Sequence, residues 1–170
     1  MSVIAYVAVS LDGFLAHHDG AVSFLDDYGS DEFDFQGFMD SVGALVMGST
    51  TYEQVLGWGW PYGDLPAMVL TSRDLPVAEG ATIEFSSAPT GEAIRALAER
   101  TDKRVWIVGG GDTITAGLEA NAIDELELYV MPTALGEGIP LFTRSYSGPL
   151  TLTEARSYSN GVVKLHYAVG

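Results

Sequence analysis

The sequence has no cysteine and few basic residues: eight lysines and arginines stand against 23 aspartates and glutamates, a formal charge of −15. The absence of cysteine excludes disulfides and any thiolate nucleophile or metal ligand. The shortage of basic residues argues against nucleic acid and anionic membranes as partners, because both are bound by basic surfaces. The three histidines, His17, His18 and His166, are too few and too scattered to indicate a zinc site. We therefore expect no bound metal.

The sequence also lacks a long hydrophobic run. No apolar stretch approaches the roughly 20 residues that a membrane span requires, and no charged segment with a cleavage signal precedes the apolar run at 3–9. We therefore expect a cytoplasmic protein that does not interact with membranes. The length of 170 residues, 47% of them hydrophobic, fits one domain over 1–170 with a sizeable core.

Two apolar runs are each followed at once by glycine and by a helical pattern. Residues 44–47 lead into Gly48, and residues 105–108 lead into Gly109-Gly110-Gly111. At a turn between a strand and a helix, backbone N–H groups converge and can bind an anion without lysine or arginine. One such turn could be purely structural, but two favour a ligand with more than one phosphate. The pattern is neither a Walker loop nor G-x-G-x-x-G, since Ile114 stands where the third glycine would be.

The order of the remaining patterns predicts an α/β fold. Buried strands are expected at 3–9, 44–47, 66–70 and 105–108, and helices at 30–42, after 49, after 90 and from 113. Ser30 is the expected cap of the first of these helices, with Asp31 and Glu32 in its first turn, and Thr90 is the expected cap of the third. A strand at 125–130 and a hairpin around Asn160-Gly161 follow. We predict a mostly parallel central sheet with an antiparallel C-terminal hairpin at one edge.

Five segments in this order resemble the dihydrofolate reductase-like superfamily, and in particular the reductase domain of bacterial riboflavin biosynthesis. They are residues 3–16, 45–53, 69–73, 105–113 and 124–142. The motifs typical of that branch are Ser10-Leu11-Asp12-Gly13 and Leu135-Gly136-Glu137-Gly138-Ile139-Pro140-Leu141-Phe142. The resemblance implies a three-layer fold and NADPH as cofactor.

The resemblance also implies where NADPH would bind. Contacts to the nicotinamide are expected from Ala8, Val9, Leu15 and Ala16, and contacts to the pyrophosphate from Gly48, Ser49, Thr50, Thr51, Val108, Gly109, Gly110, Gly111, Asp112 and Thr113. Thr71, Ser72 and Arg73 would receive the 2′-phosphate, because an arginine beside two hydroxyls suits a phosphate monoester. The family often has a cis peptide within the glycine run. Ser49 replaces an arginine that is common in the family.

The substrate side of the site is less defined. A proton donor is expected among the acids of the first helix: Asp34 is the first candidate, with Asp31 and Glu32 as alternatives. Residues that could line a planar-ring pocket are Phe24, Phe35, Trp58, Trp60 and Tyr62. The resemblance implies an NADPH-dependent reductase of the 5-amino-6-(5-phosphoribosylamino)uracil reductase type, acting on a small heterocyclic or carbonyl substrate and commonly paired as a homodimer. The alternative is a non-catalytic nucleotide-binding or ligand-sensing module on the same fold.

Overall fold

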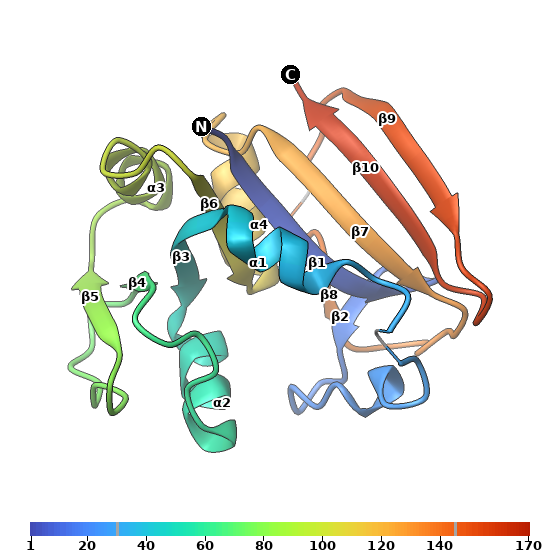
Figure 1. Cartoon of the computed structure of the whole chain (residues 1–170), viewed down its shortest axis with the longest axis horizontal. Helices are drawn as coiled ribbons and strands as arrows, with labels where there is room; N and C mark the ends of the chain where they lie inside the picture. Colours follow the sequence, from blue (N-terminus) through green and yellow to red (C-terminus); the bar gives the residue numbers. More distant parts are fainter. Residues whose placement is uncertain (30, 145) are drawn as a thin grey trace.

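A central eight-stranded sheet, covered by helices on both faces, organises the computed structural model, which describes residues 1–29, 31–144 and 146–170 (Figure 1). Its strands are β1 (Val3–Ser10), β3 (Val42–Gly48), β4 (Pro66–Leu70), β5 (Thr82–Ser86), β6 (Arg104–Gly109), β7 (Glu125–Met131), β9 (Leu150–Ser157) and β10 (Val163–Val169). They lie in the order β5-β4-β3-β6-β1-β7-β10-β9. The strands from β5 to β7 in this order are parallel, and β10 is antiparallel to both of its neighbours. The predicted mostly parallel sheet with an antiparallel C-terminal hairpin edge is confirmed.

The helices form the outer layers of the fold. They are α1 (Phe35–Ser41), α2 (Ser49–Trp58), α3 (Thr90–Ala98) and α4 (Gly111–Glu119), with a short 3₁₀ turn, η1, at Ser23–Leu25. Phe38 of α1 and Tyr52 of α2 pack with Leu45 on one face, whereas Ile94 of α3 packs with Val46 on the other. Leu45 and Val46 face opposite layers because successive side chains of a strand alternate between its faces. None of the helices in the described ranges is long and apolar enough to span a bilayer.

A second, two-stranded sheet joins two loops that are distant in sequence. Strand β2 (Phe14–Ala16) pairs with β8 (Ile139–Pro140), and Leu141 N–H donates to Gly13 O over 2.9 Å. Asp12 strengthens this junction, since its carboxylate accepts hydrogen bonds from Leu135 N at 3.0 Å and Gly136 N at 2.7 Å. The two motifs typical of the riboflavin branch therefore lie against each other in space.

The first helix begins later than the sequence predicts. Its N-cap is Asp34, whose carboxylate accepts a hydrogen bond from Gly37 N at 3.0 Å. Asp31 and Glu32 precede the helix, so their placement in its first turn was wrong, and Ser30 lies outside the described residues. Aspartate caps a helix as well as serine does, so local sequence alone did not choose between the two starts. Similarly, Thr90 is the first residue of α3 rather than its cap.

Candidate functional site

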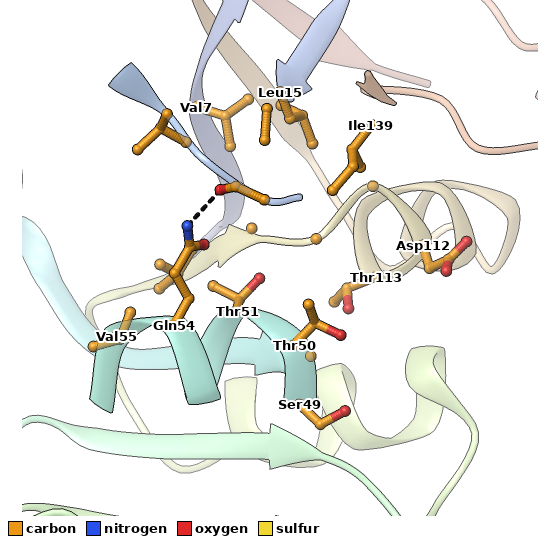
Figure 2. Close-up of a pocket in the computed structure, with 18 of the residues that line it drawn as sticks. Val7, Leu15, Ser49, Thr50, Thr51, Gln54, Val55, Asp112, Thr113 and Ile139 are labelled. Atoms are coloured by element: carbon orange, nitrogen blue, oxygen red, sulfur yellow. Dashed lines mark hydrogen bonds between the residues drawn. The ribbon is translucent and has the colours of Figure 1, made fainter. Parts of the chain in front are cut away.

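A cleft of about 690 Å³ opens at the carboxyl ends of β1, β3 and β6. Figure 2 shows part of its wall, where side chains of β1, β2, α2 and α4 surround one space. This edge is where open α/β sheets bind their ligands. The cleft wall includes, of the predicted cofactor residues, Ala8, Leu15, Ala16, Gly48, Ser49, Thr50, Thr51, Val108, Gly109, Gly110, Gly111, Asp112 and Thr113. The structure thus brings both predicted glycine turns to one cleft.

The two glycine turns meet at the starts of α2 and α4. Their N-cap residues, Gly48 and Gly110, provide no side-chain cap to the first-turn N–H groups. A Cβ atom built on Gly48 would lie 3.0 Å from Thr113 Oγ1, which shows how closely the turns approach. Figure 2 shows Ser49 and Thr50 on one helix start and Thr113 on the other, around the same space. Two helix N-termini with uncapped amides suit a pyrophosphate group.

Gly110 gives the second turn its shape. Its φ of +94° lies in a region that side chains other than glycine rarely adopt. All peptide bonds of the described residues are trans, so the cis peptide expected within the glycine run is not present. Positive φ at Gly110 directs the chain from β6 into α4 instead.

A charged group also stands at the start of α4. Asp112 Oδ1 accepts a hydrogen bond from Thr143 Oγ1 at 2.5 Å, and both residues line the cleft. Arg144 also lines the cleft, and its guanidinium forms an ion pair at 3.4 Å with Glu119, the last residue of α4. Asp112 therefore places a negative charge at the helix start where a phosphate would bind.

The loop after β1 covers the other side of the cleft. Leu15 and Ala16 reach the wall from β2, and Gln54 Nε2 donates to Gly20 O over 2.5 Å, the dashed line in Figure 2. Ala8 lines the cleft, but Val9 does not: it is 2% exposed and packs in the core beneath α3 and α4. Adjacent residues of a strand face opposite ways, so Ala8 and Val9 cannot present their side chains on one face.

The predicted 2′-phosphate residues lie outside the cleft wall. The wall ends at Leu70 and does not include Thr71, Ser72 or Arg73. Arg73 instead forms a two-pronged ion pair with Glu53 of α2, with N–O distances of 3.2 and 2.8 Å. Hydrogen bonding to Arg73 lowers the pKa of Glu53, and the same contact raises the pKa of Arg73. The role of these three residues in binding a phosphate stays a prediction.

Aromatic side chains form the opposite end of the cleft, on the side of α1. Tyr6, Trp58, Tyr62 and Trp106 line it, and the Tyr6 ring stacks on Phe38 with ring centroids 4.0 Å apart. Burial raises the pKa of both Tyr6 and Tyr62 to about 12, so both phenols stay protonated at neutral pH. Of the aromatic residues suggested from sequence, Trp58 and Tyr62 line this wall.

Phe24, Phe35 and Trp60, suggested for the same wall, do not line it. Tyr6 and Trp106 were not predicted from the sequence, because both stand within apolar runs that indicate a buried strand. The one available signal was a polar hydroxyl or indole N–H in such a run, since these groups require a partner when buried. Trp106 Nε1 finds its partner in Tyr6 O at 3.0 Å.

The predicted acidic residues do not line this cleft. Asp34 is exposed and accepts a hydrogen bond from Gly37 N of α1. Glu32 accepts hydrogen bonds from Ser159 N, at 3.2 Å, and from the Ser159 hydroxyl. Asp31 is exposed as well. Asp34 remains close enough that its charge contributes to raising the pKa of Tyr6. A catalytic role for any of these acids stays a prediction.

Comparison with known proteins relates the whole chain to one family. Residues 1–164 match the family model described as RibD C-terminal domain. The uncharacterized protein YwjB of Bacillus subtilis (strain 168) is 32% identical over 168 residues, which cover 96% of this chain and 95% of that protein. Among solved structures, one named "Putative riboflavin biosynthesis protein", from Shewanella sp. PV-4, superposes with a TM-score of 0.85 at 27% identity and covers 100% and 99% of the two chains. Dihydrofolate reductase from Enterococcus faecalis complexed with NADP(H) matches with a TM-score of 0.70 at 18% identity, over 99% and 96% of the chains.

Proposed function

Because this chain belongs to the RibD C-terminal domain family, we propose that it is an NADPH-dependent reductase that transfers hydride to a small heterocyclic or carbonyl compound. The observation that carries the proposal is the pair of uncapped helix starts, α2 and α4, on opposite sides of one cleft. A reductase of this kind needs a site for a pyrophosphate beside a dry pocket for a planar ring. The two uncapped helix starts and the aromatic residues of the wall support such an arrangement.

The residues of the cleft fit a dinucleotide in a definite orientation. The amides at the starts of α2 and α4 and the hydroxyls of Thr50 and Thr51 would hold the pyrophosphate. Ala8 and Leu15 would pack against the nicotinamide, and Gln54 would keep the covering loop in place through Gly20. When bound, NADPH supplies the hydride, and the protein supplies alignment and exclusion of water. A dihydrofolate reductase with a similar fold is known complexed with NADP(H), which supports this choice of cofactor.

The end of the cleft that is lined by aromatic side chains suits an uncharged substrate. Among the described residues of the cleft wall, the basic side chain is Arg144, which pairs with Glu119 of α4. The aromatic end is lined instead by Tyr6, Tyr62 and other aromatic side chains, which favour flat, weakly charged molecules. We therefore propose a substrate without a phosphate group at this end.

Titration of the protein with NADPH and NADH tests the cofactor assignment. Trp58 and Trp106 line the cleft, so cofactor binding should quench tryptophan fluorescence and transfer energy to the reduced nicotinamide. We expect saturable binding of NADPH, with weaker binding of NADH. The absence of binding by either cofactor would refute the proposed function.

The alternative function is a nucleotide-binding or ligand-sensing module without catalysis. It is favoured by the position of Asp34, which caps α1 rather than lining the cleft. Incubation of the NADPH complex with candidate substrates separates the two functions: a reductase oxidises the cofactor, whereas a sensor binds the same compounds and leaves its 340 nm absorbance unchanged.

We propose one domain over 1–170 that acts in the cytoplasm as a homodimer. The support for a dimer is β9, which ends the sheet with most of its residues exposed, including Leu152 at 52%. Sedimentation of the purified protein measures the oligomeric state directly, and a monomer at micromolar concentration would contradict the dimer.

A further inference from the structure

A cluster of ionisable side chains lies between β7 and β10, outside the cleft. His166 stands opposite Glu127 in the antiparallel register, and its Nδ1 atom is 2.8 Å from Glu127 Oε2. Its other nitrogen, Nε2, is 2.8 Å from Glu125 Oε2. The three side chains are only 10–20% exposed. Both nitrogens of one imidazole ring therefore face carboxylates.

This geometry bears on the number of protons in the cluster. Nε2 of His166 forms a hydrogen bond with Glu125, and Nδ1 lies at ion-pair distance from Glu127. A neutral imidazole carries one N–H and can serve only one of these carboxylates, whereas an imidazolium offers an N–H to each. A proton stored on the ring would therefore face a carboxylate at either nitrogen.

A tyrosine pair connects this cluster with the cleft. Tyr129 donates its hydroxyl proton to Glu127 Oε1 over 3.1 Å. The rings of Tyr129 and Tyr6 have centroids 5.1 Å apart, and the contact between them is among the causes that shift the pKa of each tyrosine. Because the Tyr129 proton is directed at Glu127, the Tyr129 oxygen keeps lone pairs that can accept a proton. Tyr6 in turn lines the cleft at its aromatic end.

We propose that Tyr6 is the proton donor to the reduced substrate and that the cluster of Glu125, His166 and Glu127 resupplies it through Tyr129. This inference rests on the proposed reductase function. It assigns to a tyrosine of β1 the role for which the sequence suggested an acid of the first helix. Tyr129, Glu127 and His166 act through Tyr6 and are positioning and relay residues.

Tyr6, Tyr129 and the cluster together account for the proton that the reaction requires. Hydride addition to the carbon of a C=N or C=O bond leaves an electron pair on its nitrogen or oxygen. The Tyr6 O–H bond breaks and its proton goes to that atom; the Tyr129 hydroxyl then returns a proton to the Tyr6 oxygen. Tyr129 recovers a proton from the cluster, which is refilled from solvent at the partly exposed Glu125. A phenol whose pKa is raised to about 12 by burial gives up its proton only to such a strong base.

Other ionisable groups surround the relay and affect its charge balance. Around Tyr6 they are Glu127, Tyr158 and Asp34, all of which contribute to raising its pKa. Around the cluster they are Arg104, 3.5 Å from Glu125, and Glu154, which stands opposite His166 on β9. Arg104 offsets part of the negative charge of the two glutamates, so the cluster is not left with an unbalanced buried charge.

The stored proton can be tested without cofactor or substrate. In the protein labelled with ¹⁵N-histidine, we expect both ring N–H groups of His166 to give slowly exchanging NMR signals at pH 7. The exposed His18 provides the internal comparison, since we expect its ring protons to exchange rapidly with water. A single His166 ring N–H at pH 7 would overturn the relay.

The role of Tyr6 is tested by turnover with 7,8-dihydrofolate, 5-amino-6-ribosylaminouracil and 4-nitrobenzaldehyde as probes. We expect Tyr6→Phe to lower turnover roughly 100-fold, the scale of general acid catalysis, while NADPH still binds. Tyr62→Phe is the matched comparison, because Tyr62 is also a buried phenol of the cleft; we expect it to change KM and to leave the pH dependence of kcat unchanged.

The relay predicts coupling between its members. Tyr129→Phe and Glu127→Gln should each change the pH dependence of kcat. Each should have little further effect on kcat in the Tyr6→Phe background, because the effects of substitutions within one hydrogen-bonded relay are not additive. Additive effects would indicate a merely structural role and overturn the relay. A protein that binds NADPH but oxidises it with none of the probes overturns the assignment of Tyr6 and leaves the cofactor site standing. A protein that binds no NADPH refutes the proposed function itself.

Discussion

Arg73 and Glu53 face each other as a two-pronged ion pair, in which Arg73 Nη1 donates to Glu53 Oε1 at 3.2 Å and Nη2 donates to Oε2 at 2.8 Å. Arg73 is the residue that the resemblance assigns to the 2′-phosphate of NADPH, so a phosphate must compete with Glu53 for it. We expect Arg73→Ala to weaken NADPH binding roughly tenfold, the scale of a charge-assisted hydrogen bond, and to leave NADH binding unchanged. We expect Glu53→Gln to strengthen NADPH binding. Equal effects on both cofactors would remove Arg73 from the 2′-phosphate site.

Asp112 is predicted to oppose the binding of a pyrophosphate. Its carboxylate stands at the start of α4, on the wall of the cleft, where Thr143 holds it. Asp112→Asn removes the negative charge and keeps the oxygen that accepts from Thr143. We therefore expect tighter binding of NADPH and NADH by a few-fold at low salt, with a smaller gain at high salt because ions screen the charge.

The matched control for Asp112 is Asp102→Asn. Asp102 is an exposed residue that precedes β6 and so lies at the opposite end of that strand from the cleft. The Asp102→Asn variant should leave the affinities for NADPH and NADH unchanged. Equal gains for the two variants would indicate an effect of net charge rather than of the site.

Gly110→Ala tests the backbone of the second turn. Its φ of +94° strains any residue with a Cβ atom, and that atom would also lie 3.4 Å from Thr113 Oγ1. We expect a loss of roughly 1–3 kcal/mol in the free energy of unfolding and weaker cofactor binding. Gly57→Ala in α2 is the control, since nothing lies within 4 Å of its Cβ position; there we expect a gain of up to about 1 kcal/mol. Urea unfolding measures both, and equal effects would contradict the role of the turn.

The hydrogen bonds that the Asp12 carboxylate accepts should make the free energy of unfolding depend on pH. Hydrogen bonds from Ser10, Leu135 and Gly136 lower its pKa in the folded protein from 3.8 to about 2. The unfolded chain therefore binds the proton more readily, so the stabilisation is complete above pH 3.8 and is lost as the pH falls toward 2. We expect Asp12→Asn to reduce this fall in urea-unfolding experiments between pH 5 and 2. The control Glu79→Gln, at an exposed residue, should retain the wild-type pH profile.

Much of the fold follows from local sequence. The predicted strand at 66–70 coincides with β4, and the Asn160-Gly161 turn joins β9 and β10 as expected. Both signals are local: a short apolar run between breakers indicates a strand, and Gly161 supplies the positive φ of +89° that its turn requires. The start of α1 was misplaced because Ser30 and Asp34 are equally good caps by sequence, and packing of Phe38 beneath the sheet decides which turn is helical.

The layers of the fold and the two glycine turns follow from local sequence, because strand and helix periodicities and the demand for positive φ are properties of neighbouring residues. Long-range packing governs which side chains share a space. It placed Tyr6 on the cleft wall, set Arg73 against Glu53 and brought His166 of β10 beside Glu125 and Glu127 of β7. The alternation of Glu125 and Glu127 with leucine indicates a strand with one face in water, whereas these two carboxylates are largely covered. That difference depends on strand pairing across 41 residues of sequence, which no local pattern encodes.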